Sequence, residues 1–220
     1  MIVITGASGG LGGELAKLYK KDGKTVINVS RNPSEYADKN LIHDLTKGSE
    51  IEAAAAEILK INEPLEVLIN CAGIYSTDDL ADITEEEIKK NMATHVKAPI
   101  LLTSKLLEKI KKDHSDIVNV VSAVATKANP NEAVYGASKW ALRGFTENLQ
   151  LEFKKLPNRV IGFYPGGFSS ELFLKATGND VTKEGSWMRT EDVAKCLKQL
   201  LDLPKNMEVS SIVINRKVTK

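Results

Sequence analysis

The chain has 220 residues, 42% of them hydrophobic and 27% charged, which suits one soluble domain with a sizeable core. Its formal net charge of +1 excludes bulk electrostatic attraction to nucleic acid or to an anionic membrane. The sequence has no apolar run long enough to span a bilayer and no secretory pattern at its start, and its two cysteines, Cys71 and Cys196, lack framework spacing. We therefore expect a cytoplasmic protein without nucleic-acid or membrane partners. No metal site is expected either, because the histidines are scattered: His43, His95 and His114.

Short β-branched apolar runs alternate with longer helical patterns along the whole chain. This alternation predicts an α/β fold, a doubly wound parallel sheet of about seven strands with helices on both faces, formed by residues 1–220 as a single domain. The expected strands are 2–5, 25–30, 40–43, 65–70, 116–122, 159–164 and 209–215, and the expected helices are 11–22, 48–61, 84–112, 131–155 and 190–203.

One connection, at about 166–189, is much longer than strand-to-helix connections usually are. Connections of this length are mostly functional lids or disordered segments. Its large apolar residues make disorder less favourable, so we expect a substrate lid; they are Phe168, Leu172, Phe173, Leu174, Trp187 and Met188.

A glycine-rich turn, TGASGGLGG, follows the first expected strand and leads into the first expected helix. Gly6, Gly10 and Gly12 would allow a tight turn in which backbone N–H groups approach the pyrophosphate of a dinucleotide. The alternative is an ordinary tight strand-to-helix turn. The position of the turn, between strand and helix, favours dinucleotide binding.

The second expected strand ends in Ser30 and Arg31, where an NAD-binding chain usually has an acidic residue for the ribose. A guanidinium there suits a 2′-phosphate, so NADP(H) is favoured. Two alternatives stay open: Arg31 is a solvated loop residue, or Glu35 or Asp38 folds back onto the ribose and the cofactor is NAD(H).

Tyr135 and Lys139 are four residues apart and would share one face of the expected helix 131–155. A free tyrosine has a pKa near 10, and a neighbouring ammonium should lower it toward the range of a useful general acid. The pair alone is weak evidence, since any exposed helix can carry it. Ser122, thirteen residues before Tyr135, would lie at the end of the fifth strand, where it could bind a substrate oxygen.

These motifs occur together and in order, and the chain resembles the compact, single-domain, NADP(H)-preferring type of the short-chain dehydrogenases/reductases, whose sheet is of the Rossmann type. The matching stretches are Thr5-Gly6 to Gly12, Asp44-Leu45, Asn70-Cys71-Ala72-Gly73, the Ser122 to Tyr135 to Lys139 spacing, and Pro165-Gly166. The chain departs from the family pattern in having Cys71 for a second Asn, Ser170 for a Thr, and Gly9 where NADPH-using members often have a basic residue.

The resemblance implies a role for each matching residue. The implied catalytic residues are Asn91, Ser122, Tyr135 and Lys139, with Asn91 holding a water that leads toward Lys139. The implied cofactor-binding residues are Gly6, Ser8, Gly9, Gly10, Leu11, Gly12, Arg31, Asp44, Leu45, Asn70, Ala72, Gly73, Tyr135, Lys139, Pro165, Gly166, Phe168 and Ser170.

We therefore expect an oxidoreductase that transfers a hydride between NADP(H) and a small or medium, fairly apolar carbonyl or alcohol, with Tyr135 as general acid and base. The alternative is an NADP(H)-binding sensor or regulatory protein with little turnover. The resemblance also implies a homodimer through helices 91–112 and 131–155.

Overall fold

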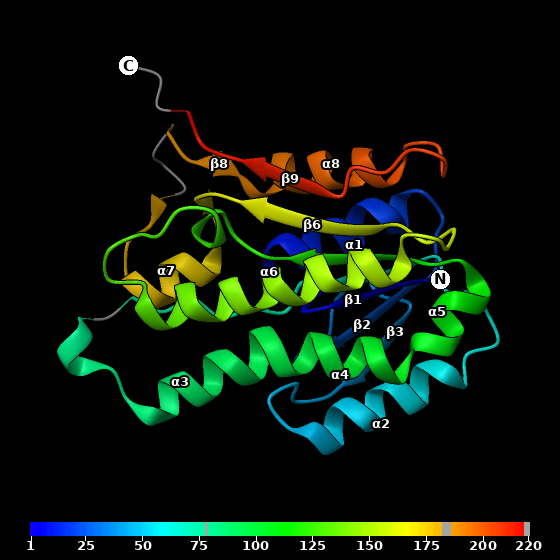
Figure 1. Ribbon diagram of the computed structural model, residues 1–220, viewed down its shortest axis with the longest axis horizontal. Helices are drawn as coiled ribbons and strands as arrows, with labels where there is room; N and C mark the ends of the chain where they lie inside the picture. Colours follow the sequence, from blue (N-terminus) through cyan, green and yellow to red (C-terminus); the bar gives the residue numbers. More distant parts are fainter. Residues whose placement is uncertain (78, 182–185, 218–220) are drawn as a thin grey trace.

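A seven-stranded parallel sheet forms the centre of the computed structural model, which describes residues 1–77, 79–181 and 186–217 (Figure 1). Its strand order is β3-β2-β1-β4-β5-β6-β9, and every neighbouring pair is parallel, as the sequence predicted. The strands are β1 (Ile2–Thr5), β2 (Val26–Ser30), β3 (Lys39–Ile42), β4 (Val67–Asn70), β5 (Asp116–Val120), β6 (Val160–Pro165) and β9 (Ser211–Ile214). The helices are α1 (Gly10–Lys21), α2 (Gly48–Leu59), α3 (Glu85–Met92), α4 (Ala98–Lys105), α5 (Leu107–Asp113), α6 (Ala133–Phe153), α7 (Glu171–Thr177) and α8 (Thr190–Leu201).

The inner strands are buried along their whole length because helices cover both faces of the sheet. Successive residues of β1 point into different cores: Ile2 and Ile4 belong to one and Val3 to the other. A strand covered on both sides needs apolar residues at every position, which explains the continuous apolar runs of the sequence.

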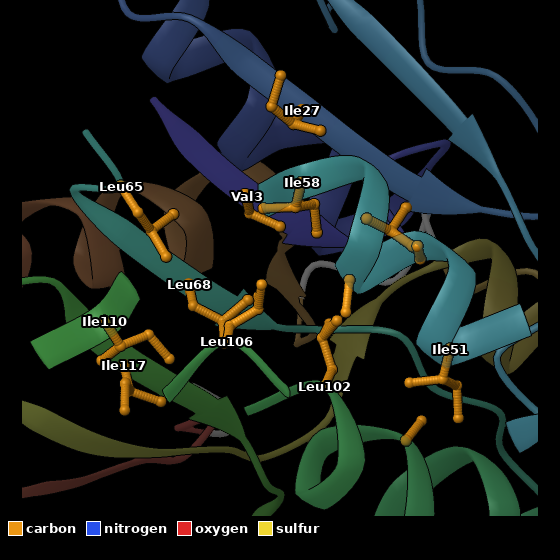
Figure 2. Packing of buried hydrophobic residues seen from close by; sticks show 14 of the residues in the cluster. Val3, Ile27, Ile51, Ile58, Leu65, Leu68, Leu102, Leu106, Ile110 and Ile117 are labelled. Atoms are coloured by element: carbon orange, nitrogen blue, oxygen red, sulfur yellow. The ribbon is translucent and has the colours of Figure 1, made fainter. Parts of the chain in front are cut away.

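The two cores lie on opposite faces of the sheet. One is formed with α2, α4, α5 and α6, and Figure 2 shows its packing around Leu68, where Leu102, Leu106 and Ile110 meet the sheet. The other is formed with α1 and α8, through residues such as Leu15 and Leu197.

The helix expected over 84–112 is right in extent but not in continuity, because a π-helical turn and an interruption at Leu106 divide it. α3 ends at Met92, a π-helical turn covers Ala93–Lys97, and α4 and α5 are separated at Leu106. Pro99 has no N–H for the carbonyl four residues back, and the Ala98 N–H donates five residues back, to Ala93 O. The start of this region is as expected, since the Thr84 side chain accepts from the Glu87 N–H at 3.2 Å.

The expected lid contains short regular elements. Strands β7 (Phe168–Ser169) and β8 (Met188–Arg189) pair in parallel and flank α7. Ser170 caps α7 by accepting from the Phe173 N–H at 3.4 Å. Residues 182–185 of the expected lid lie outside the described residues.

The strand order reverses direction between β1 and β4, which lie side by side at the centre of the sheet. In doubly wound sheets, ligands bind outside the carboxyl ends of the strands at such a reversal. The carboxyl ends of these two strands lead directly to the glycine-rich turn and to the segment 71–74.

Candidate active site

The glycine-rich turn leaves open space beside the first backbone N–H groups of α1. Gly6 has φ +74°, and a Cβ there would lie 2.9 Å from the Ala72 Cα; a Cβ on Gly12 would lie 2.4 Å from the Gly6 carbonyl oxygen. These two positions therefore require glycine. In contrast, a Cβ on Gly9 or Gly10 would meet no described atom within 4 Å, and no described side chain caps the helix. Uncapped N–H groups beside open space fit a diphosphate.

Thr5 joins the ends of β1 and β4. Its hydroxyl accepts from the backbone N–H groups of Cys71 and Ala72, both at 2.9 Å. The segment 71–73 is thus fixed against the glycine-rich turn. Sequence reasoning used Thr5 only as part of a motif and missed this contact.

Asn28 supports the turn from the neighbouring strand, β2, and was also missed. Its Oδ1 accepts from the Ala7 N–H at 3.1 Å, and its Nδ2 donates to Asn32 O and to Asn40 Oδ1. A buried amide in an apolar strand satisfies its polar atoms in this way. Asn28 thereby links the glycine-rich turn to the loop that carries Arg31.

Arg31 lies just past the end of β2, at the position that the sequence predicted, and its side chain is exposed. The alternative ribose partner Asp38 is wrong, because its carboxylate accepts from the N–H of Val26, the first residue of β2, and pairs with Lys20. Asp38 therefore lies at the amino end of the strand, away from Arg31. Glu35 interacts instead with the side chain of Tyr36.

Asp44 lies near Arg31 and caps the following turn. Its Oδ1 accepts from the Thr46 N–H at 3.0 Å and from the Thr46 hydroxyl at 2.8 Å. These bonds hold the pKa of the Asp44 carboxyl below its usual value, and Lys47 and Arg31 add to the effect.

A narrow depression lies beside Asn70, between the end of β4 and the start of α4. Asn70 Nδ2 donates to Asn119 Oδ1 at 2.9 Å, while its Oδ1 is buried and has no hydrogen-bond partner in the described ranges. The depression is lined by Thr5, Leu45, Asn70, Ala72, Thr94, Ala98, Pro99 and Leu102. It therefore contains three of the residues expected to bind cofactor.

The four expected catalytic residues come from three elements. Ser122 follows β5, Tyr135 and Lys139 lie in the first turns of α6, and Asn91 lies at the end of α3. The Lys139 ammonium is 5.8 Å from the Tyr135 ring centroid and donates to Val120 O at 3.1 Å.

Asn91 is fully buried beside the π-helical turn. Its Nδ2 donates to Glu87 O at 3.1 Å and to Ser76 Oγ at 3.3 Å. Its Oδ1 has no hydrogen-bond partner among the residues that the structure describes. A buried amide oxygen in this state fits an ordered water.

Burial moves the pKa values of Tyr135 and Lys139 in opposite directions. It raises the pKa of the Tyr135 phenol to about 12, against a hydrogen bond from Ser122 that lowers it. It lowers the pKa of the Lys139 ammonium to about 8. The expected net lowering of the Tyr135 pKa by Lys139 is therefore wrong for this structure, because desolvation dominates both groups.

An aromatic row connects the lid to Tyr135. The ring centroid of Tyr75 is 5.1 Å from that of Tyr135, edge to face, and 5.7 Å from that of Phe173. Phe173 in turn lies 4.6 Å from Trp187, and the Tyr75 hydroxyl donates to Glu132 at 2.8 Å. The lid thus packs against the aromatic neighbour of Tyr135.

The remaining expected cofactor residues differ in how they could contact a ligand. Ser8 is exposed on the glycine-rich turn, whereas Leu11 is buried in the core, so only its backbone is available. Pro165 ends β6, and the Gly166 N–H donates to Ile214 O at 2.7 Å. Phe168 is half-buried in β7.

Two residues close to Tyr135, His95 and Ser138, were not among the expected site residues. His95 was treated as one of three scattered histidines, yet it is fully buried in the π-helical turn. It contacts Ser138, which lies between Tyr135 and Lys139 in α6. Only the fold brings the two together, so no local sequence signal could have found the pair.

The described ranges 1–77, 79–181 and 186–217 contain no group of three side chains placed to hold a metal ion. Within the same ranges, no helix is long and apolar enough to cross a membrane.

Comparison with known proteins relates the chain to one family. The sequence model for that family, described as short chain dehydrogenase, matches residues 1–180. A 3-ketodihydrosphingosine reductase of Bacteroides thetaiotaomicron is 32% identical over 173 residues, which are 77% of this chain and 64% of that protein. An uncharacterized oxidoreductase of Thermotoga maritima is 33% identical over 186 residues, 78% of this chain and 72% of that protein.

Solved structures share the fold over nearly the whole chain. A serine dehydrogenase complexed with NADP+ has a TM-score of 0.87 at 21% identity, covering 97% of this chain and 94% of its own. A 4-hydroxyisoleucine dehydrogenase complexed with NADH and succinate has a TM-score of 0.82 at 25% identity, covering 98% of both chains. One complex holds NADP+ and the other NADH, so these structures do not decide the cofactor preference.

Replacing Lys139 by Met should change how stability depends on pH. The Lys139 pKa is about 8 in the folded chain and 10.5 as an unperturbed group, so between these values the unfolded chain binds more protons. The free energy of unfolding should therefore rise by up to about 3 kcal/mol as the pH increases from 8 to 10.5. The same contribution is lost when the pH falls through 8. Urea unfolding of cofactor-free protein at pH 7.5 and pH 10 should show this rise in the native chain and not in Lys139→Met.

A matched control is Lys105→Met, because the Lys105 side chain is 46% exposed and its ammonium pairs with Glu52 at the surface. The free energy of unfolding of Lys105→Met should rise between pH 7.5 and pH 10 as it does in the native chain. Equal pH dependence in the native chain and Lys139→Met would contradict the lowered pKa of Lys139.

Proposed function

The chain belongs to the short-chain dehydrogenase family, and from that premise we propose that it is an NADP(H)-dependent oxidoreductase acting on a small or medium, fairly apolar carbonyl or alcohol. Tyr135 is its general acid and base. The observation that carries the proposal is the meeting of Ser122, Tyr135 and Lys139 at the carboxyl end of β5, at the same edge of the sheet as the glycine-rich turn that follows β1.

The proposed cofactor-binding residues would contact a dinucleotide from its adenosine to its nicotinamide. The backbone at Gly9 and Gly10 would hold the diphosphate. Asp44, Leu45 and the backbone of Ala72 would contact the adenosine, as the family resemblance implies. Lys139 would bind the hydroxyls of the nicotinamide ribose. When bound, the nicotinamide supplies or takes up the hydride.

The chain's own residues orient the carbonyl and deliver the proton. Ser122 donates a hydrogen bond to the carbonyl oxygen and stabilises the negative charge that develops on it. Tyr135 is protonated across neutral pH, since burial raises its pKa to about 12, and it donates its phenolic proton to that oxygen. The Lys139 ammonium, 5.8 Å from the ring, stabilises the phenolate that remains.

Proton resupply follows from the properties of Lys139 and Asn91. With a pKa of about 8, Lys139 can release a proton near neutrality more easily than an exposed lysine can. A water bound to the unpartnered Oδ1 of Asn91 would lead from Lys139 toward solvent, as the family resemblance implies.

The walls of the site favour an apolar substrate. Tyr75, Phe173 and Trp187 form a row of rings that begins beside Tyr135 and extends into the lid. Such surfaces bind apolar groups well. The Bacteroides relative is named as the reductase of a keto compound, which accords with a carbonyl substrate.

A sensor that binds NADP(H) without turnover is the second candidate. We disfavour it because such a protein has no need for an acid, an oxyanion donor and a cation in one site. This chain has all three, in Tyr135, Ser122 and Lys139.

Replacing Tyr135 by Phe should abolish most turnover while NADPH binding persists. Removing a general acid typically lowers the rate by about 100- to 10,000-fold. The measurement is NADPH oxidation with a panel of aldehydes, ketones, diketones and quinones, together with NADPH binding by fluorescence.

Tyr75→Phe is the matched control, because it keeps the ring against Tyr135 and removes only the hydroxyl that bonds to Glu132. It should stay within about tenfold of the native rate. Full activity in Tyr135→Phe would show that another group is the acid, and NADPH binding without turnover by the native chain would favour the sensor.

Replacing Arg31 by Ala should weaken the preference for NADPH over NADH. A guanidinium bonded to a 2′-phosphate contributes about 1.5–3 kcal/mol, so the ratio of the two kcat/KM values should fall by about 10- to 100-fold. Lys24→Ala, at the amino end of β2, is the control and should leave the ratio unchanged. An unchanged ratio in Arg31→Ala would mean that Arg31 does not bind the phosphate.

We also propose a homodimer through helices 91–112 and 131–155. On α6, Trp140 and Leu151 lie on one face and are 47% and 71% exposed. Light scattering should give a dimer for the native chain and a monomer for Leu151→Glu, with unchanged unfolding of the protomer. A native monomer at micromolar concentration would contradict this proposal.

A further inference from the structure

His95 lies between the segment 71–74 and the first turns of α6, which carry Tyr135 and Lys139. It lies in the π-helical turn Ala93–Lys97, four residues after Asn91, and its side chain is fully buried. π-helical turns are rare and occur mostly as single turns at functional sites. The turn directs the imidazole between the segment 71–74 and the first turns of α6.

The hydrogen bonds of His95 determine its tautomer. Nε2 accepts from the backbone N–H of Ile74 at 3.0 Å, so Nε2 carries no proton. The proton is therefore on Nδ1, which lies 2.8 Å from Ser138 Oγ. The Ser138 hydroxyl in turn donates to the carbonyl of Tyr135 at 2.7 Å. Nε2 of the imidazole is thus a hydrogen-bond acceptor and Nδ1 a hydrogen-bond donor, each with one partner.

The groups around the ring keep it neutral. Burial lowers the pKa of His95 well below its usual value, and the charge of Lys139 on α6 lowers it further. The Tyr135 ring packs edge to face against the imidazole, with 5.6 Å between the two ring centroids. Gly73 also lies close to the imidazole, since a Cβ at this position would be 3.4 Å from Nε2. A protonated ring could not accept from Ile74.

We propose that His95 is a positioning residue that fixes the segment 71–74 to the turn of α6 that carries Tyr135 and Lys139. The proposal rests on the function proposed above. One end of the chain of hydrogen bonds is Ile74, in the segment that the Thr5 hydroxyl holds against the glycine-rich turn. The other end is the backbone of Tyr135 itself. His95 thus sets the distance between the seat of the cofactor and the general acid.

The expected size of the effect follows from geometry. Misplacement of a reacting group by about 1 Å can lower a rate by about 100-fold. Without the imidazole, the Ile74 N–H loses its acceptor and Ser138 loses its donor, so neither side is held at its present distance. Ground-state binding of the carbonyl does not depend on these bonds, so kcat should change more than KM.

The test compares four variants of the full chain. His95→Leu removes both hydrogen bonds, His95→Gln keeps one acceptor and one donor, and Ser138→Ala cuts the chain at its second link. The double variant His95→Leu/Ser138→Ala shows whether the two act together. Thr146→Val is the control, because Thr146 is equally buried on α6 and bonds to Asn119, away from Tyr135.

His95→Leu and Ser138→Ala should each lower kcat by about 10- to 100-fold with KM for the carbonyl within about threefold. The kcat of the double variant should lie within about threefold of the kcat of the slower single variant. His95→Gln should recover most of the native kcat. Thr146→Val should lose thermal stability and keep its kcat. Equal kcat in the control and in His95→Leu, or fully additive losses, would overturn the proposal.

A second measurement does not depend on turnover. Amide hydrogen exchange at residues 72–75 should be at least about tenfold faster in His95→Leu than in Thr146→Val, and NADPH should bind more weakly. If the native chain reduces no carbonyl, the proposed function fails, yet exchange and NADPH binding still decide the role of His95. Unchanged exchange and unchanged binding would overturn it. Should His95→Leu not fold, Ser138→Ala and His95→Gln give the same comparison.

Discussion

The contact between the end of β1 and the segment after β4 is the constraint on which the site depends. Gly6 lies so close to Ala72 that a Cβ would be 2.9 Å from its Cα, and the Thr5 hydroxyl accepts from two N–H groups of that segment. The two strand ends are therefore held together by direct contacts. The open space at Gly9 and Gly10 adjoins one of them, and His95 connects the other to Tyr135. Cofactor site and acid thus share one rigid support.

Burial, rather than the cation, sets the ground state of the acid. The Tyr135 pKa is raised and the Lys139 pKa is lowered because both charged forms lose hydration. A protonated phenol next to a readily neutralised ammonium suits the reduction of a carbonyl, in which the phenol must give up its proton. The attraction between the two charges appears only when the phenolate forms, so it stabilises the transition state more than the resting state.

The fold and the local motifs were predictable because they depend on neighbours in sequence. A strand buried on both faces must be apolar throughout, and a spacing of four residues fixes Tyr135 and Lys139 on one helix face. The helix over 84–112 was predicted correctly in extent but not in continuity, since apolar periodicity does not register a π-helical turn. The contact of His95 with Ser138 spans 43 residues, and the position of Asp38 depends on how the loop after β2 folds back. Neither the His95–Ser138 contact nor the position of Asp38 can be predicted from neighbouring residues in the sequence.

The most direct test of the account is a crystal structure of the protein with NADP(H). We expect the diphosphate against the backbone of Gly9 and Gly10, the 2′-phosphate near Arg31, and the nicotinamide beside Ser122 and Tyr135, with the Ile74 to His95 contact unchanged. A dinucleotide bound elsewhere, or none after saturating exposure, would contradict the proposed oxidoreductase and the arrangement of its site.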